Sequence, residues 1–328
     1  MTNVFVFAET RNGVLRQVAL ETLTAARAAL DASGGGEVHA MVIGGPGISQ
    51  AAEHLGNHGA DVVLVVEDPA LERYSPEVAT ATAAALITER GYGLAVFSAS
   101  AEGRDLAPRV AATLGVGLAS DVISLEIGND AITAKHPVYT GKAIATLRLT
   151  GTPAIVTVRP GAVSATESAR TARIESIAPA LAPSAARVVV TEFGARTSKV
   201  DLAEAPVIIA GGRGLKAAEN FVLLEALADA FGNAAVGATR AVTDDGWRNA
   251  ADQIGQTGRL VNPELYIGIG ISGAVQHLAG MRGSKVIVAI NNNKDAPIFK
   301  IADYGIVGDL NEIVPVLTEA VGKAKASS

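Results

Sequence analysis

Short apolar runs alternate with longer segments of helical period along the first half of the chain. The apolar runs are Val4–Ala8, Val38–Ile43, Asp61–Val66 and Leu94–Ser98. The segments of helical period that follow them are Val14–Asp31, Ile48–Asn57, Pro76–Arg90 and Gly103–Leu114. Strands separated by helices of this length are typical of β-α-β units, which build a parallel sheet. The pattern therefore predicts an α/β domain with a parallel sheet, of the nucleotide-hydrolase-like kind.

The period changes to two between Asp121 and Arg159. The runs Ile144–Leu149 and Ile155–Val158 alternate apolar and polar residues, and Gly151–Pro153 separates them. Alternation of this kind, broken by turn residues, predicts antiparallel strands appended to the parallel sheet.

A segment rich in Ala, Ser and Pro, Ala178–Arg187, leads to one further predicted strand, Val188–Thr191. The following residues Ser198–Ala205 are polar and have no strong period, which is typical of a boundary between domains. We therefore expect an N-terminal α/β domain over residues 1–197 and a C-terminal domain over residues 198–328.

The C-terminal domain repeats the alternation of strand and helix. Its expected elements are Val207–Ala210, Lys216–Phe231, Ala235–Gly237, Leu265–Ile271, Gly273–Ala279, Lys285–Ile290, Tyr304–Val307 and Glu312–Lys323. This order predicts a doubly wound α/β domain, and an open sheet of this kind binds ligands outside the carboxyl ends of its strands.

The sequence contains no cysteine, which excludes thiol nucleophiles, dithiol redox centres and thiolate-bound iron–sulfur clusters. A redox function would therefore need a bound cofactor. His54 and His58 are four residues apart, so a helix would place both on one face. No further ligand cluster surrounds them, and a metal site usually needs three or four convergent groups, so no metal site is predicted.

The formal charge of −6 includes no long basic run, which argues against nucleic acid or an anionic membrane surface as the main partner. Met1 leads directly into the apolar run Val4–Phe7 without a basic region, and no apolar stretch approaches the roughly 18 residues of a spanning helix. We expect a cytoplasmic bacterial protein that does not insert into a membrane.

Unusual residues of the C-terminal domain fall at the predicted carboxyl ends of its strands. Gly211–Gly214 follows the first strand, where glycines permit close backbone approach to a ligand and Arg213 can neutralise an anion. Ser272 and Gly273 stand at a predicted helix start, whose free N–H groups suit a phosphate. Asn291 and Asp309 each follow a strand and can hydrogen-bond sugar or base edges.

Two further segments complete this edge of the predicted sheet. Gln253–Arg259 is short, polar and glycine-containing, as loops that position hydrogen bonds often are. Thr239 and Arg240 end another strand, and a guanidinium there can lie over a flat aromatic ring or meet negative charge on it. Each feature alone has a plain structural reading as a tight turn, helix cap, buried histidine or solvated charge. Together they indicate a dinucleotide site without identifying the dinucleotide.

At these residues the sequence resembles electron transfer flavoprotein alpha subunits. The segments that carry the resemblance are GGRGLKAAENF (Gly211–Phe221), GATRAV (Gly237–Val242), QIGQTGRLVNPELYIGIGISGAVQHLAGM (Gln253–Met281), KVIVAINNN (Lys285–Asn293) and APIFKIADYGIVGDL (Ala296–Leu310). Their order and spacing together are highly specific, and they cover the C-terminal domain. The N-terminal domain matches more loosely, in HPVYTGKAIAT (His136–Thr146) and TVRP (Thr157–Pro160).

The resemblance implies FAD in an extended pose on the C-terminal domain and a beta subunit that completes a heterodimer. By position within the motifs, the residues that match FAD contacts of the family are Arg213, Thr239, Arg240, Ile254, Gly255, Gln256, Thr257, Ser272, Gly273, Ala274, Val275, Gln276, His277, Asn291, Asp309 and Leu310.

Within that set, the resemblance implies three residues that tune the flavin. Thr257 looks like the residue whose hydroxyl bonds flavin N5, His277 like the partner of the C2 carbonyl, and Arg240 like the cation over the ring. One-electron reduction places negative charge around N1 and the C2 carbonyl, so His277 and Arg240 would stabilise that state. Asn291 and Asp309 are placed to hold the adenosine end.

The sequence departs from the family pattern at three places. Five residues, Asn291 to Asp295, stand before Ala296 where the family commonly has three, so the adenosine contact falls on Asn291, Asn292 or Asn293. Thr239 replaces a usual serine, and the stretch Asp244–Asp252 lacks a proline often found before the loop.

The function that follows is that of an electron carrier rather than an enzyme. FAD would accept electrons from flavin dehydrogenases, such as acyl-CoA dehydrogenases, and pass them to a membrane quinone oxidoreductase or a similar acceptor. One alternative is an oxidoreductase that uses the same crevice for NAD(P) and transfers hydride. Another is a structural subunit that binds no cofactor.

Overall fold

The computed structural model describes residues 3–128, 130–139, 141–192 and 200–326. The chain divides into two compact units, Met1–Phe193 and Gly194–Ser328. The predicted domain boundary between residues 197 and 198 lies outside the described residues.

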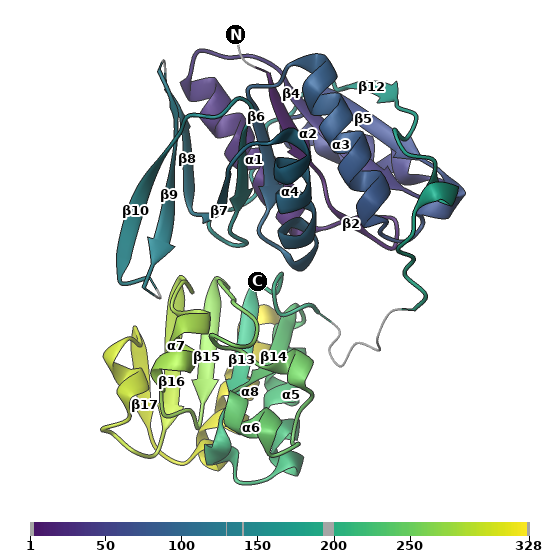
Figure 1. Ribbon diagram of the computed structural model, residues 1–328. Coiled ribbons are helices and arrows are strands. Elements are labelled where there is room, and N and C mark those ends of the chain that lie inside the picture. The colour runs from purple at the N-terminus through teal and green to yellow at the C-terminus, as the bar shows by residue number, and fades with distance from the viewer. Residues whose placement is uncertain (1–2, 129, 140, 193–199, 327–328) are drawn as a thin grey trace. The chain divides into compact units, whose positions relative to one another are not determined.

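A parallel sheet of seven strands forms the centre of the N-terminal unit (Figure 1). In sheet order the strands are β12 (Arg173–Ser176), β5 (Val62–Glu67), β4 (Val38–Gly44), β1 (Val4–Phe7), β6 (Leu94–Ser98), β11 (Ala154–Val158) and β7 (Leu118–Val122). Every residue of β1, β6 and β11 is buried, as expected for parallel strands that are covered on both faces.

Helices cover both faces of this sheet, and each face has its own hydrophobic core. On one face lie α1 (Gln17–Ala32) and α2 (Ala51–Asn57), and on the other lie α3 (Pro76–Arg90) and α4 (Ala101–Leu114). The shorter elements are β2 (Thr10–Arg11), β3 (Val14–Leu15), η1 (Ile48–Gln50), η2 (Pro69–Leu71) and η3 (Pro183–Ala185).

The predicted antiparallel extension is present as a separate sheet of three strands. It consists of β8 (Ser124–Ile127), β9 (Ile132–Val138) and β10 (Ala143–Leu149), with β9 in the middle. β8 lies against α1, so one face of this small sheet joins the core of the unit.

Four details of the N-terminal prediction were wrong. Ile155–Val158 belongs to the parallel sheet, between β6 and β7; its apparent alternation comes from Thr157, a buried residue whose hydroxyl accepts a hydrogen bond from the backbone N–H of Asp121. Val188–Thr191 is not a strand, whereas the charged edge strand β12 was missed. Val14 belongs to β3, and the helix begins three residues later at Gln17.

The C-terminal unit is built on a parallel sheet of five strands. In sheet order they are β14 (Ala234–Ala238), β13 (Val207–Gly211), β15 (Leu265–Ile269), β16 (Val286–Asn291) and β17 (Tyr304–Val307). The chain starts at β13, adds β14 on one side and then adds the other strands on the opposite side. The order therefore reverses between β13 and β15, which is where open α/β sheets bind their ligands.

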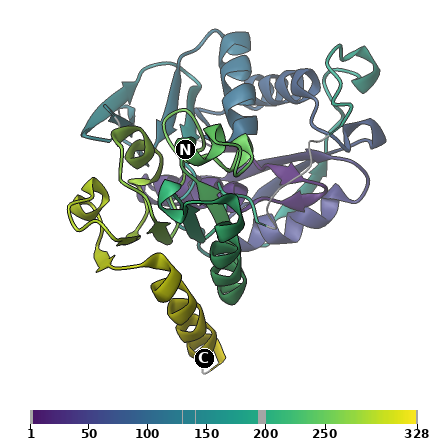
Figure 2. The same ribbon diagram turned by 90° about the horizontal axis from the view of Figure 1, so that it is seen from below.

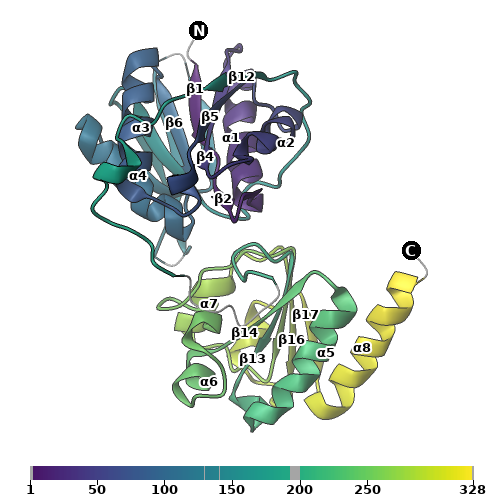
Figure 3. The same cartoon turned by 90° about the vertical axis from the view of Figure 1, so that its right-hand side faces the viewer.

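Helices cover both faces of this sheet, which confirms the doubly wound class. The helices α5 (Phe221–Phe231) and α8 (Leu310–Ala326) pack side by side on one face (Figure 2). On the other face lies α7 (Val275–Met281), across the sheet from α5 and α8 in Figure 3. η7 (Pro297–Lys300) packs on the same face as α7. The remaining elements are η4 (Arg213–Leu215), η5 (Ala218–Asn220), α6 (Arg240–Asp244) and η6 (Ala250–Asp252).

Two helices of this unit begin later than predicted. The helix expected from Lys216 begins at Phe221, because Lys216 has a left-handed backbone with φ of 69° that ends η4. The helix expected from Gly273 begins at Val275, because Gly273 has φ of 90°. Within the part of the chain that the structure describes, no helix has both the length and the apolar character needed to cross a membrane.

Candidate cofactor site

The loops after β13 and β15 interlock at the point where the strand order reverses. The backbone N–H of Gly212 donates to the carbonyl of Ile269 at 2.9 Å, and that of Gly214 donates to the carbonyl of Gly270 at 3.0 Å. A Cβ on Gly212 would lie 2.3 Å from the Gly270 oxygen, closer than atoms can approach. These glycines are therefore required by the packing of one loop on the other, whatever ligand the loops approach.

A small hollow of about 40 Å³ opens beside these loops, at the carboxyl ends of β16 and β17. The residues that line it are Gly214, Lys216, Gly270, Asn291, Asn292, Gly308, Asp309, Leu310 and Asn311. The structure thus brings together Asn291 and Asp309, as expected from their positions at the ends of neighbouring strands, and places Leu310 beside them. It adds Lys216, which the sequence analysis placed in a helix, and Arg213 does not line the hollow.

Asp309 is an ionised carboxylate at the start of α8. Its Oδ1 accepts hydrogen bonds from the backbone N–H and from the side-chain amide of Asn311, both at 2.8 Å. These two bonds, together with the positive charge of Lys216, hold the pKa of Asp309 below its ordinary value. Asp309 thus caps the start of α8, and the residue is exposed.

The asparagine run after β16 holds its own loop. The side-chain amide of Asn291 donates to the carbonyl of Ile271 at 2.9 Å, and its Oδ1 accepts from the N–H of Asn293 at 2.9 Å. The Oδ1 of Asn293 in turn accepts from the N–H of Asp295 at 3.0 Å. Asn292 is exposed and lines the hollow together with Asn291.

The loop Gln253–Gly258 is fixed by backbone hydrogen bonds to both of its neighbours. The N–H of Ile254 donates to the carbonyl of Ala238, at the end of β14, at 2.9 Å. The N–H of Gln256 donates to the carbonyl of Gln276, in α7, at 2.8 Å. A Cβ on Gly280 would lie 2.4 Å from the nitrogen of Gly255, so α7 and the loop are in direct backbone contact.

His277 lies beneath this loop and is buried, with 5% of its surface exposed. Its Nδ1 lies 3.0 Å from the carbonyl oxygen of Ile254, which can only accept, so Nδ1 carries the proton. Its Nε2 then accepts a hydrogen bond from the hydroxyl of Tyr266 at 2.7 Å. Burial lowers the pKa of His277 to about 4, although the bond to Ile254 acts in the opposite direction.

Both ring nitrogens of His277 therefore have partners inside the protein. The imidazole is neutral at pH 7 and holds the Ile254 end of the loop against β15. A hydrogen bond from His277 to a flavin carbonyl, which the resemblance implies, stays a prediction, because it requires the ring to exchange one of these partners.

The remaining predicted residues of this loop region lie at the surface. Thr257 is exposed and accepts a hydrogen bond from the side-chain amide of Gln253 at 3.0 Å. Arg240 is exposed and pairs with Asp244 one turn further along α6, with Nε 3.2 Å from Oδ2. Thr239 donates its backbone N–H to the carbonyl of Gly211 at 3.0 Å, which ties the ends of β14 and β13 together.

A loop connects β15 to α7, and α7 is a helix of only two turns. Ser272, Ala274, Val275 and Gln276 are exposed, whereas Gly273 is buried against Ile298. A Cβ on Gly273 would lie 2.4 Å from the Ile298 nitrogen. Val275 and Gln276 at the start of α7 therefore face solvent beside the loop Gln253–Gly258, whereas His277 in the same turn is buried.

The predicted site residues thus form two groups along one edge of the sheet. One group consists of Arg240, the loop Gln253–Gly258 and α7, beside the end of β14. The other consists of Asn291, Asp309 and Leu310 at the hollow beside the ends of β16 and β17, which Lys216 also lines. The sequence analysis did not single out Lys216, Gln253 or Tyr266. Of these three, only Gln253 could have been found from the sequence, because it lies in the polar loop.

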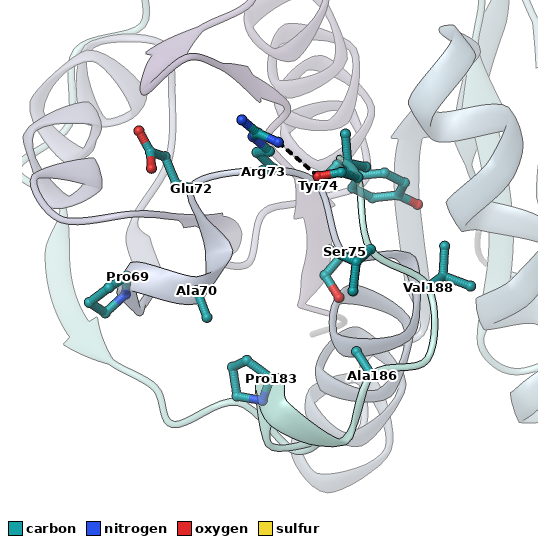
Figure 4. Close-up of a pocket in the computed structure, with 11 residues that line it drawn as sticks. Pro69, Ala70, Glu72, Arg73, Tyr74, Ser75, Pro183, Ala186 and Val188 are labelled. Atoms are coloured by element: carbon teal, nitrogen blue, oxygen red, sulfur yellow. Dashed lines mark hydrogen bonds between the residues drawn. The ribbon is translucent and has the colours of Figure 1, made fainter. Parts of the chain in front are cut away.

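A larger cavity, of about 320 Å³, lies in the N-terminal unit between η2, the start of α3 and the segment 183–190 (Figure 4). Arg73 lines this cavity, and its guanidinium group donates a hydrogen bond to the carbonyl of Val190 at 2.9 Å. No predicted site residue lines this cavity. Among the described residues, no group of three or more His, Cys, Asp or Glu side chains is arranged to hold a metal ion.

The two units match two family models. Residues 4–182 match the electron transfer flavoprotein domain, and residues 201–282 match the electron transfer flavoprotein FAD-binding domain. The doubly wound C-terminal unit is therefore a FAD-binding domain, and FAD is its cofactor.

Similar proteins span almost the same length. The electron transfer flavoprotein subunit alpha of Bacillus subtilis is 44% identical over 319 residues, which cover 96% of each chain. That of Mycobacterium tuberculosis is 41% identical over 99% of this chain and all of its own. Protein FixB of Clostridium saccharobutylicum is 40% identical over 98% of this chain and 96% of its own. The chain belongs to the electron transfer flavoprotein family, among its alpha subunits.

Proposed function

We propose that this chain is the FAD-carrying subunit of a cytoplasmic, heterodimeric electron transfer flavoprotein and pairs with a beta subunit. It accepts electrons from flavin dehydrogenases, such as the acyl-CoA dehydrogenases of fatty-acid β-oxidation, and passes them to a membrane quinone oxidoreductase or a similar acceptor. When bound, FAD supplies the electron storage. The chain itself binds and orients the cofactor and breaks no substrate bond.

The adenosine half of FAD belongs at the hollow beside β16 and β17. Lys216 supplies a positive charge for the pyrophosphate, and the carboxylate of Asp309 can accept a ribose hydroxyl. Asn292 offers both a donor and an acceptor to the adenine or the sugar, while Asn291 holds the loop from which Asn292 projects. This donor set fits an anionic dinucleotide.

The flavin half belongs at the loop Gln253–Gly258. The hydroxyl of Thr257 would bond flavin N5, and the guanidinium of Arg240 would stabilise negative charge that develops on the ring. His277 acts from below, either directly on the C2 carbonyl or by fixing the carbonyl of Ile254. Both the loop and α6 are held by backbone hydrogen bonds, so the backbone that carries these groups is fixed.

The observation that carries this proposal is the convergence of polar side chains at the reversal of strand order, within a unit that matches a FAD-binding domain. A nicotinamide-dependent hydride transfer at the same crevice is not favoured, because the matched family domain binds a flavin.

Co-expression of the chain with its genomic neighbour, followed by a visible spectrum of the purified complex, tests the proposal. We expect a yellow heterodimer that contains one FAD on this chain and releases it on denaturation. A colourless complex that does not take up added FAD would contradict the proposed function, and a nicotinamide-dependent activity in its place would support hydride transfer.

A further inference from the structure

A chain of side-chain hydrogen bonds runs from α6 to the exposed hydroxyl of Thr257. The Oγ1 of Thr243 lies 2.9 Å from the carbonyl oxygen of Arg240 and 3.1 Å from Oε1 of Gln253. The Nε2 of Gln253 lies 3.0 Å from Oγ1 of Thr257. Gln253 therefore bridges the helix that begins at Arg240 and the residue expected to bond the flavin.

Hydrogen bonds fix the backbone of Gln253, so the position from which its side chain extends is also fixed. Its N–H donates to the carbonyl of Ala250 at 3.2 Å, and its carbonyl accepts from Arg259 at 2.7 Å. A Cβ on Gly258 would lie 2.4 Å from the same carbonyl oxygen, so the loop closes tightly around this residue. The amide group is held at its far end by Thr243.

The chemistry of the groups sets the direction of the bond to Thr257. The hydroxyl of Thr243 shares its single proton between the carbonyl oxygen of Arg240 and Oε1 of Gln253, and Nε2 of Gln253 donates to Oγ1 of Thr257. An amide N–H can only donate, so Oγ1 of Thr257 accepts, and the hydroxyl proton of Thr257 is not used by Gln253. That proton remains available to a ligand on the exposed side of the loop.

We propose that Gln253, held by Thr243, is a positioning residue that directs the hydroxyl proton of Thr257 toward flavin N5. The proposal rests on the function proposed above, in which Thr257 contacts the flavin. Gln253 does not touch the reacting atoms; it acts by fixing the rotation of the Thr257 hydroxyl.

Loss of this orientation should change how strongly the site prefers one redox state of the flavin. A hydrogen bond of ordinary net strength corresponds to a change of roughly threefold to tenfold in that preference. This factor is equivalent to a shift of about 30 to 60 mV in a one-electron midpoint potential, at 59 mV per factor of ten.

The test is a double-mutant cycle on the FAD-loaded heterodimer. Gln253→Met removes the amide without adding charge, and Thr257→Val removes the hydroxyl with little change in shape. For each variant, the midpoint potential and the dissociation constant of FAD are measured. Gln50→Met, at an exposed position of the N-terminal unit, is the matched control and should leave both unchanged.

We expect Gln253→Met to shift the potential in the same direction as Thr257→Val, and the double variant to equal Thr257→Val alone. A shift of the same size in both backgrounds would show that Gln253 acts without Thr257 and would overturn the proposal. An unchanged potential in Gln253→Met or in Thr257→Val would also overturn it. Absence of FAD from the wild-type complex would instead refute the proposed function.

Thr243 provides a second route if Gln253→Met does not fold. Thr243→Ala removes the group that orients the Gln253 amide, and Thr243→Ser keeps the hydroxyl. We expect the potential to shift in Thr243→Ala and to return to the wild-type value in Thr243→Ser. Equal potentials in the two variants would contradict the proposal.

Discussion

The buried pair of Tyr266 and His277 permits a sharp test of how the flavin loop is supported. Tyr266→Phe removes only the hydroxyl that donates to Nε2 of His277. The ring of Tyr266 is fully buried, so no water replaces the lost donor and Nε2 is left as an unsatisfied acceptor. We expect the free energy of unfolding of the C-terminal unit to fall by about 1–3 kcal/mol.

The pH dependence of stability gives a second measure of the same pair. Burial lowers the pKa of His277 to about 4 from an ordinary value of 6.5. Between these pH values the unfolded chain binds a proton at His277 and the folded chain does not, so the stability present above pH 6.5 is lost as the pH falls. The loss is about 2 kcal/mol at pH 5 and about 3 kcal/mol below pH 4.

The assay is chemical denaturation of the FAD-free chain, followed by the fluorescence of Trp247. This residue is the single tryptophan of the sequence and packs, partly buried, against the core of the C-terminal unit, so it reports on that unit alone. His277→Gln should remove most of the loss between pH 7.5 and pH 5, whereas His54→Gln, at an exposed position, should retain it. An identical pH slope in wild type and His277→Gln would refute the assignment of a buried neutral imidazole.

Three other predictions concern the site. Gly280→Ala places a Cβ 2.4 Å from the nitrogen of Gly255. It should therefore lower the free energy of unfolding by about 1–3 kcal/mol and weaken FAD binding. An unchanged denaturation curve together with an unchanged affinity for FAD would contradict the close contact. Lys216→Gly removes the strain of a side chain on a left-handed backbone, so it should raise the free energy of unfolding of the FAD-free chain by up to about 1 kcal/mol, yet weaken FAD binding by about tenfold. An affinity for FAD equal to that of wild type would show that Lys216 is not part of the site. Arg240→Ala removes a cation beside the ring and should lower the midpoint potential of bound FAD, whereas Asp244→Asn, which frees Arg240 from its ion pair, should not; equal potentials in wild type and Arg240→Ala would count against that role.

The fold could be predicted largely from hydrophobic periodicity. Buried strands such as β1 and β6 form uninterrupted apolar runs between helices, and that pattern leaves few alternatives. The failures arose where local pattern and tertiary position disagree. β12 pairs at the edge of the sheet through its backbone although its side chains are charged, and β11 contains a buried threonine that imitates alternation.

The part of the site that lies at the carboxyl ends of parallel strands could be predicted from the sequence. Asn291 and Asp309 follow adjacent parallel strands, so their proximity is a consequence of topology. Lys216 was missed because the sequence predicts a helix at this position. In the structure its backbone is left-handed, and that conformation brings Lys216 to the hollow. Tyr266 was missed because a tyrosine in a buried strand has no sequence signal that distinguishes a packing ring from a hydrogen-bond donor to a histidine.

The measurement that tests the central claim most directly is an experimental structure of the heterodimer saturated with FAD. We predict that FAD lies along the carboxyl ends of the C-terminal sheet, with its adenosine half beside Asp309 and Lys216 and its ring beside Thr257. A flavin bound elsewhere, for example in the cavity beside Arg73 in the N-terminal unit, would contradict the proposed site.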